Sequence, residues 1–455
     1  MTTLPRPPYL LAAAWLLPIA APPLVDGAVR VDPDGRLGAV GPRSALSAAH
    51  PALPIVDLGP CALLPGLVNV HAHPELTLLR HALEDLPLHS WIPALRARTA
   101  RWTPEDFDLA ARWGLVEALR AGITTVAVTE ASGASAAALR EAGLRGVVYV
   151  EAFGPDPARV DDAWADLERR LAAVARHASE LVRMGVSPHA PYSVSDALYR
   201  RVAATAAERD LDVATHIAES AAEVELVRRA EGPWAAALRA RGLTVAPRAR
   251  SPVDLLARTG VLERAPLLVH AVHIDEEDTA QIAASGARVA HCPVANAKLG
   301  HGVAPVPELL GAGVRLGLGT DSVAANNRLD LLDEGRAATL LQRARCADAT
   351  LLPARQVLRL LTLGGAEALG IVQIEMHPVE NRDFGRTRGQ EAGAEGHEHG
   401  EPLAGVERVE VLGEVGRAHD EAGHPRRVGD LLGAQQPEDE EIEARAQGAR
   451  GGQDR

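Results

Sequence analysis

Eight short apolar runs, separated by stretches with helical spacing, constrain the fold of this 455-residue chain more than any other feature. Each run holds about four to eight residues and is rich in Val and Leu, as expected of a strand covered on both faces. The intervening stretches carry helix signals: after the candidate N-cap Thr103, Pro104 and acidic residues fill the first turn. Strand alternating with helix predicts a parallel sheet. The runs are GLVNVHAH, GITTVAVTE, GVVYVEAF, LVRMGVSPH, LDVATHIAE, PLLVHAVH, ARVAHCP and VRLGLGTDS.

The number of runs and the residues that end them predict the architecture. Eight βα units, between about Leu67 and Leu369, are the number that closes a barrel. Several runs end in a histidine or an acid, and such barrels carry their chemistry at the carboxyl ends of the strands. We therefore predict an α/β fold, a distorted (β/α)8 TIM barrel, with these side chains at one end: His71, His73, His189, His216, His270 and Asp321.

His71 and His73 form the most informative pair. Alternation along a strand sends residues i and i+2 to the same face, so both imidazoles can point at one ion. Alone, this pair is a weak signal, because two histidines at this spacing are more often a chance or surface pair. The further polar strand ends change that balance and favour a metal site.

These motifs resemble those of the amidohydrolase superfamily, in particular its metal-dependent aminohydrolase and chlorohydrolase branch. That branch includes adenosylhomocysteine, guanine and aminofutalosine deaminases and the triazine chlorohydrolases. The resemblance runs from about Leu10 to Leu369 and keeps the family order of motifs. It rests on PGLVNVHAH, SPHAPYS, THIAES, VHAVH, HCPVANAKL and GTDSVAANNRLDLLDE.

The resemblance implies a ligand set of His71, His73, His216 and Asp321 for one divalent metal ion, Zn²⁺ or Fe²⁺. Three neutral imidazoles and a carboxylate suit such an ion, and an open coordination position lowers the pKa of bound water to about 7. Glu219 resembles the proton shuttle of the family.

The resemblance also suggests further roles around this centre. His270 would polarise the substrate, and Asp321 would double as a proton acceptor. His189 and Glu75 would contact substrate, although Glu75 fits a solvated rim position equally well. For His273 and His291 we favour supporting or packing roles over direct chemistry; they also lie near strand ends.

The lysine content bears on the number of metal ions. Binuclear members of the superfamily bridge two ions with a carboxylated lysine from the fourth barrel strand, but the one lysine here, Lys298, lies within HCPVANAKL. We therefore predict a mononuclear site. This favours deamination or dechlorination at an aromatic ring carbon.

The motifs most resemble those of aminofutalosine deaminases, which act in menaquinone synthesis. We predict a hydrolase of carbon–nitrogen bonds other than peptide bonds, a cyclic amidine deaminase that removes the exocyclic amine of an adenine-like ring. A guanine- or triazine-type amino- or chlorohydrolase is the alternative. Ala295 and Ala325 stand where family members often carry Ser, which favours a different ring or slower turnover.

Composition and charge narrow the setting. The net charge of −13 argues against a nucleic-acid partner, and no apolar run is long enough to cross a membrane. Three scattered cysteines support neither a disulfide framework nor a cysteine metal site. We expect a cytoplasmic enzyme with a small-molecule substrate. A homo-oligomeric assembly is possible.

We predict that residues 1–62 form the first part of a small β-sandwich domain. The barrel follows and spans residues 63–370. The apolar stretch after Arg6 resembles a signal peptide, but Pro18, Pro22 and Pro23 interrupt it. We interpret it as strands, with a turn at Asp26-Gly27.

Residues 371–455 form an atypical acidic tail that replaces the strands with which family members complete the small domain. We predict that this tail is disordered or the product of a shifted reading frame. We favour the frameshift, because an expected segment is missing and a strange one is present. The small domain would then be incomplete, which leaves one more hypothesis, a metal-binding but inactive barrel.

Overall fold

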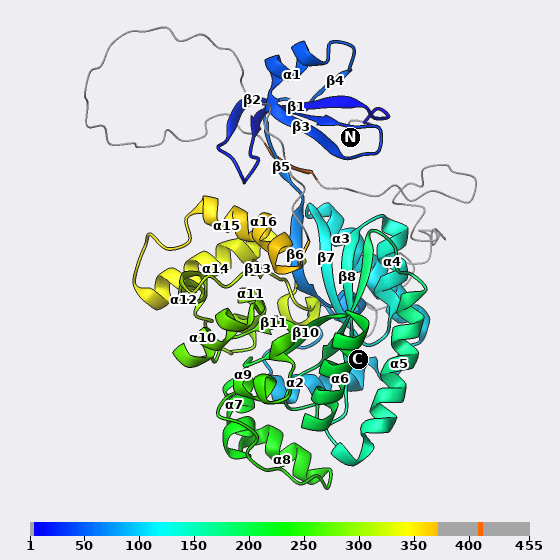
Figure 1. Cartoon of the computed structure of the whole chain (residues 1–455), viewed down its shortest axis with the longest axis vertical. Coiled ribbons are helices and arrows are strands. Elements are labelled where there is room, and N and C mark those ends of the chain that lie inside the picture. Colours follow the sequence, from blue (N-terminus) through cyan, green and yellow to red (C-terminus); the bar gives the residue numbers. More distant parts are fainter. Residues whose placement is uncertain (1–3, 372–407, 413–455) are drawn as a thin grey trace, which may run out of the picture.

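The computed structural model describes residues 4–371 and the backbone of residues 408–412. Its larger sheet has eight parallel strands whose order follows the sequence from β6 to β13 (Figure 1). The predicted barrel is confirmed, and all eight apolar runs are its strands. They are β6 (Leu67–Ala72), β7 (Ile123–Glu130), β8 (Arg145–Ala152), β9 (Val182–Pro188), β10 (Asp212–Ile217), β11 (Leu267–His270), β12 (Arg288–His291) and β13 (Leu316–Leu318).

The barrel closes between its first and last strands through the residues that follow them. Ala72, at the end of β6, forms a parallel bridge with Asp321, just beyond β13. The amide of Asp321 donates a hydrogen bond of 2.9 Å to the carbonyl of His71. The pairing of β6 with β7 is irregular in register, so the barrel is distorted at this seam.

Helices between the strands cover the barrel (Figure 1). The helix predicted after Thr103 is α3, and Thr103 and Asp106 form a reciprocal capping box at its start. The helices are α1 (Arg43–Ala49), α2 (Leu88–Thr99), α3 (Pro104–Arg120), α4 (Ala134–Ala142), α5 (Val160–Ala175), α6 (Asp196–Arg209), α7 (Ala221–Arg229), α8 (Gly232–Ala240), α9 (Pro252–Arg258), α10 (Glu276–Ser285), α11 (Pro293–Lys298), α12 (Val306–Gly311), α13 (Val323–Asn326), α14 (Leu331–Cys346), α15 (Ala354–Leu361) and α16 (Leu363–Ala368), with 3-10 turns η1 (Pro74–Leu79), η2 (Pro157–Arg159) and η3 (Leu262–Arg264).

A small sheet precedes the barrel in the sequence. Its order is β14-β5-β1-β2-β3, and β4 pairs with β1. The prediction of a turn at Asp26-Gly27 is wrong, because both residues lie inside β2. Gly27 lets this strand approach Leu16 closely: a Cβ added at Gly27 would lie 2.4 Å from the Cβ of Leu16. The strands are β1 (Tyr9–Leu16), β2 (Leu24–Val31), β3 (Leu37–Pro42), β4 (Ile55–Asp57), β5 (Cys61–Pro65) and β14 (Arg408–Leu412).

The small sheet leads into the barrel through β5, which pairs with β1 before β6 begins at Leu67. From the predicted tail, β14 pairs in parallel with β5. The expectations of disorder or a shifted frame concern residues that otherwise lie outside the described part of the chain. Among the described residues, no helix combines the length and apolar character needed to cross a membrane.

The seam generates a prediction about stability. A Cβ at Gly319 would lie 2.9 Å from the backbone nitrogen and oxygen of His71, which cannot rotate away. We expect Gly319→Ala to lower the free energy of unfolding by about 1–3 kcal/mol, the usual cost of overpacking. Chemical denaturation measures this change. Gly311→Ala is the control, because an added methyl there meets no atom within 4 Å. Equal midpoints for Gly319→Ala and the unmodified chain would contradict the prediction.

Candidate metal centre

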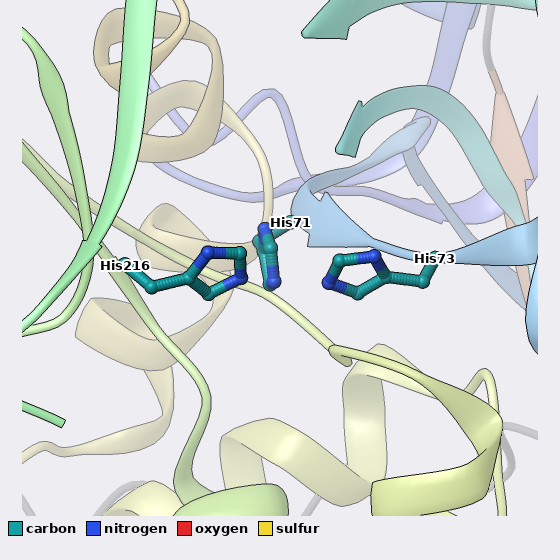
Figure 2. Close-up of side chains that lie close together, drawn as sticks. All are labelled: His71, His73 and His216. Carbon is teal, nitrogen blue, oxygen red and sulfur yellow. The ribbon is translucent and has the colours of Figure 1, made fainter. Parts of the chain in front are cut away.

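Three imidazoles meet at the carboxyl end of the barrel. His71 and His73 come from the end of β6, His216 comes from β10, and Figure 2 shows their rings pointing toward one another. One nitrogen of each ring lies within 4.8 Å of the others. The Nε2 atom of His71 is buried and has no hydrogen-bond partner among the described residues. A buried orphan nitrogen facing two other imidazoles is the arrangement that a metal ion would satisfy.

Asp321 reaches the same point from the seam of the barrel. Its Oδ1 atom lies 3.6 Å from Nε2 of His71 and 3.6 Å from Nε2 of His73. Burial favours the neutral carboxyl, but the neighbouring imidazole of His71, together with those of His270 and His73, outweighs it and holds the pKa of Asp321 well below its usual range. The structure therefore supplies an ionised carboxylate beside the three rings.

The protonation of the rings fits a metal ion. Nδ1 of His216 lies 3.1 Å from the carbonyl oxygen of His189, which can only accept, so this nitrogen carries the proton and Nε2 keeps its lone pair. Burial and the neighbouring His71 lower the pKa of His73 to about 3 and hold that of His216 well below its usual value. The rings of His73 and His216 are thus neutral at pH 7, as ligands must be.

Glu219 lies beside this centre, just after β10. Its Oε1 atom is 3.5 Å from Nε2 of His270 and 3.2 Å from Nε2 of His301. The hydroxyl of Tyr192 donates to the other oxygen at 3.5 Å. Burial raises the pKa of Glu219, but the two histidines lower it by more, and it falls to about 2. Glu219 is therefore a buried carboxylate that can accept a proton.

His270 is fixed in place by Asn296, whose side-chain oxygen lies 2.8 Å from Nδ1 of the ring. The backbone of His270 has a φ of 75°, a left-handed conformation that costs energy in a residue with a side chain. The surrounding structure holds this strain and aims Nε2 at Glu219. The candidate catalytic residues Glu219, His270 and Asp321 are thus gathered around one centre.

The two candidate substrate contacts differ in their surroundings. His189, at the end of β9, bonds through Nδ1 to the hydroxyl of Ser193 at 2.7 Å and stays partly open to the site. Glu75 is only 5% exposed, so it is not a solvated rim residue. Its carboxylate accepts from the amides of Ala131 and Ser132 at 3.3 and 3.1 Å. Its contact with substrate stays a prediction.

The remaining histidines and the lysine lie around this core. His291 is buried with neither ring nitrogen hydrogen-bonded among the described residues, and His273 is half-buried. Lys298 pairs with Glu84 at 2.9 Å, and His189 stands at the end of the fourth barrel strand instead. A carboxylated-lysine bridge at that strand end therefore has no candidate among the described residues.

Sequence reasoning missed several residues of the site. His301 follows α11 in a loop and carries no strand signal, so only the fold brings it to Glu219. Glu130 and Glu151, by contrast, lie at the ends of β7 and β8 and carry the same strand-end signal as the histidines. Burial and then the charge of Glu75 raise the pKa of Glu130 to about 8, and the same two causes raise the pKa of Glu151 well above its usual value.

Comparison with known proteins places this geometry in context. Residues 62–375 match the model of the amidohydrolase family. The chain is 38% identical over 348 residues to the 5-methylthioadenosine/S-adenosylhomocysteine deaminase of Nitratidesulfovibrio vulgaris, covering 76% of this chain and 75% of that protein.

Solved structures agree with this match. An adenosine deaminase from Xanthomonas campestris with bound zinc superposes with a TM-score of 0.69 at 33% identity, covering 80% of this chain and 81% of that one. The aminofutalosine deaminase of Helicobacter pylori also gives a TM-score of 0.69, covering 80% of this chain and 88% of that one. At 21% identity, this second likeness shows the fold alone.

The geometry predicts that His216 is needed to hold a metal ion. We expect the chain to bind one zinc ion, and His216→Ala to weaken binding by about 100-fold or more, because changing residues that merely support a ligand already costs up to that much. Competition with a zinc chelator measures the affinity. His177→Ala, outside the cluster, is the control. Undiminished zinc affinity in His216→Ala would remove this residue from the ligand set.

Proposed function

Because this chain belongs to the amidohydrolase family, a family of metal-dependent hydrolases, we propose that it removes the exocyclic amine of an adenine-like ring by hydrolysis. It is a hydrolytic deaminase, acting on carbon–nitrogen bonds other than peptide bonds, as its relatives are. The observation that carries the proposal is the carboxylate of Glu219, buried between two imidazoles beside the candidate metal ligands.

The residues that would hold the ion are His71, His73, His216 and Asp321. A divalent ion bound there supplies Lewis acidity and makes a water nucleophile available at neutral pH. The absence of a lysine from the fourth strand end supports one ion per chain, and the donor set suits zinc or iron(II) alike.

Glu219 would move the proton that the reaction requires. Water adds to the ring carbon that bears the amine, and Glu219 accepts the proton that the water loses. Glu219 then delivers this proton to the amine, and the carbon–nitrogen bond breaks with its electron pair leaving on ammonia. The remaining hydroxyl proton moves to the adjacent ring nitrogen, which leaves a ring carbonyl. His270, held by Asn296 and facing Glu219, is placed to polarise the ring at the same moment.

An aromatic surface beside Glu219 supports a flat ring as substrate. Trp234, on α8, stacks on Tyr192 with ring centroids 4.1 Å apart and an angle of 7° between the rings. Tyr192 in turn contacts Glu219 and packs edge-on against His189 at 5.6 Å. Stacked aromatic side chains next to a proton-transfer group suit a purine ring.

The substrate class follows from what candidate substrates share. The relatives at 38% and 36% identity are named 5-methylthioadenosine/S-adenosylhomocysteine deaminases. These two nucleosides, and the aminofutalosine expected from the motifs, are adenosines extended at the 5′ carbon. We therefore propose a 5′-extended adenosine as substrate, with S-adenosylhomocysteine, 5′-methylthioadenosine and aminofutalosine as the compounds to test.

The central role of Glu219 gives a direct test. We expect the zinc-loaded chain to release ammonia from at least one of these nucleosides, and Glu219→Gln to lower kcat by about 10²–10⁴-fold with zinc retained. A coupled ammonia assay measures the rate. Glu208→Gln, an exposed change on α6, is the matched control and should leave kcat unchanged.

Two outcomes would count against the proposal. Release of ammonia only from guanine or an aminotriazine would move the enzyme to the alternative substrate class. No release from any ring, with zinc bound, would favour an inactive barrel.

A further inference from the structure

Glu151 is a buried carboxyl group that the proposed reaction leaves without a role. It lies near the end of β8, with 5% of its surface exposed. Its Oε1 atom is inaccessible and has no hydrogen-bond partner among the described residues. Arg170 donates to the main-chain oxygen of Glu151 and otherwise to Asp166, so it does not satisfy the carboxyl.

The carboxyl group of Glu151 is energetically unfavourable in these surroundings unless a hydrogen-bond donor contacts it. Burying a carboxyl without a hydrogen bond is unfavourable, and the acidic groups of Glu75, Glu130 and Asp321 nearby make a negative charge on Glu151 more unfavourable still. Nε2 of His189 lies 3.8 Å from Oε1, too far for a hydrogen bond between them. One donor atom between the two groups can contact both. The geometry therefore calls for a hydrogen-bond donor or a cation.

A second metal ion fits this position less well than a donor group. Glu151, His189 and His216 each offer an atom within 4.8 Å of the others. The Nδ1 atom of His216, however, is occupied by the carbonyl of His189, and its Nε2 atom faces His71 and His73 in the first cluster. One lone pair cannot serve two ions. This leaves only Glu151 and His189 for a second ion, too few for a stable site.

We propose that Glu151 accepts a hydrogen bond from a ribose hydroxyl of the substrate, in a subsite that it shares with His189. The inference rests on the proposed function. In an adenosine-type substrate the exocyclic amine lies at Glu219, where the reaction removes it. The adenine ring has no other hydrogen-bond donor. The ribose hydroxyls are then the donors that all three candidate substrates have in common.

The neighbours of His189 suit a sugar next to a base. Phe153 packs against the ring of His189 with centroids 4.9 Å apart, and Tyr192 packs at 5.6 Å. Tyr192 also contacts Glu219, so the base and the sugar would occupy adjoining parts of one site. A buried acceptor in such apolar surroundings rejects a ligand that lacks the matching hydroxyl.

Binding of product-like nucleosides tests the subsite without relying on turnover. We would titrate the zinc-loaded full chain and its Glu151→Gln variant with inosine, 2′-deoxyinosine and 3′-deoxyinosine in a calorimeter. We expect Glu151→Gln to weaken inosine binding by about 10-fold, since an amide NH₂ group replaces one of the two carboxyl oxygens that can accept from the hydroxyl. The variant should lose little or nothing toward the deoxynucleoside that lacks the contacted hydroxyl.

The matched control is Glu208→Gln, an exposed change on α6 that lies outside the site. It should leave inosine binding unchanged. Equal weakening of all three nucleosides by Glu151→Gln, unchanged binding in that variant, or no binding of inosine to the unmodified chain would overturn the inference. So would a fall from two zinc ions to one in Glu151→Gln, which would assign Glu151 to a metal.

Failure of the inference and failure of the proposed function give different results. Ammonia release by the unmodified chain, without any hydroxyl-dependent effect of Glu151→Gln, overturns the inference alone. No ammonia release from any nucleoside overturns the proposed function, and the binding comparison still decides whether Glu151 recognises a ribose hydroxyl.

Discussion

The hydrogen bond from the amide of Asp321 to the carbonyl of His71 joins the two ends of the barrel, and the site depends on it. Without this seam, the first and last strands would carry their ligands to separate places. Gly319 permits the approach, because it leaves room for the backbone of His71. The backbone that closes the fold thus also fixes the distance between Asp321 and the imidazoles of His71 and His73. Fold stability and metal binding therefore share one set of contacts.

Burial and close neighbours determine which side chains of the site are neutral and which are ionised. The imidazoles of His73 and His216 are kept neutral, because a buried positive charge is unfavourable and each ring has others close by. Asp321 and Glu219 are kept ionised, because imidazoles surround their oxygens. The same packing therefore supplies neutral imidazole ligands and one carboxylate ligand for a metal ion. It also leaves a second carboxylate free for proton transfer.

Much of this arrangement could be predicted from the sequence, because it depends on local patterns. Apolar runs gave the eight strands, and polar residues at their ends gave the candidate ligands. The rest depends on distant contacts. Glu75 is buried because η1 folds over the end of β7, where Ala131 and Ser132 offer their amides. His301 reaches Glu219 from a loop, and no periodicity marks it. Glu151 is an acid at a strand end, as the sequence shows. That position alone does not reveal whether the folded chain supplies a hydrogen-bond partner for its carboxyl group.

Nε2 of His71 and Oε1 of Glu151 are buried at strand ends without hydrogen-bond partners within the described residues, and they differ in kind. Nε2 of His71 faces two other imidazoles and a carboxylate, surroundings that suit a cation. Oε1 of Glu151 lies 3.8 Å from one imidazole nitrogen, so a single donor atom placed beside the two can contact both. A folded chain tolerates unmet groups of this sort where a ligand meets them. One position therefore suits the metal and the other a part of the substrate.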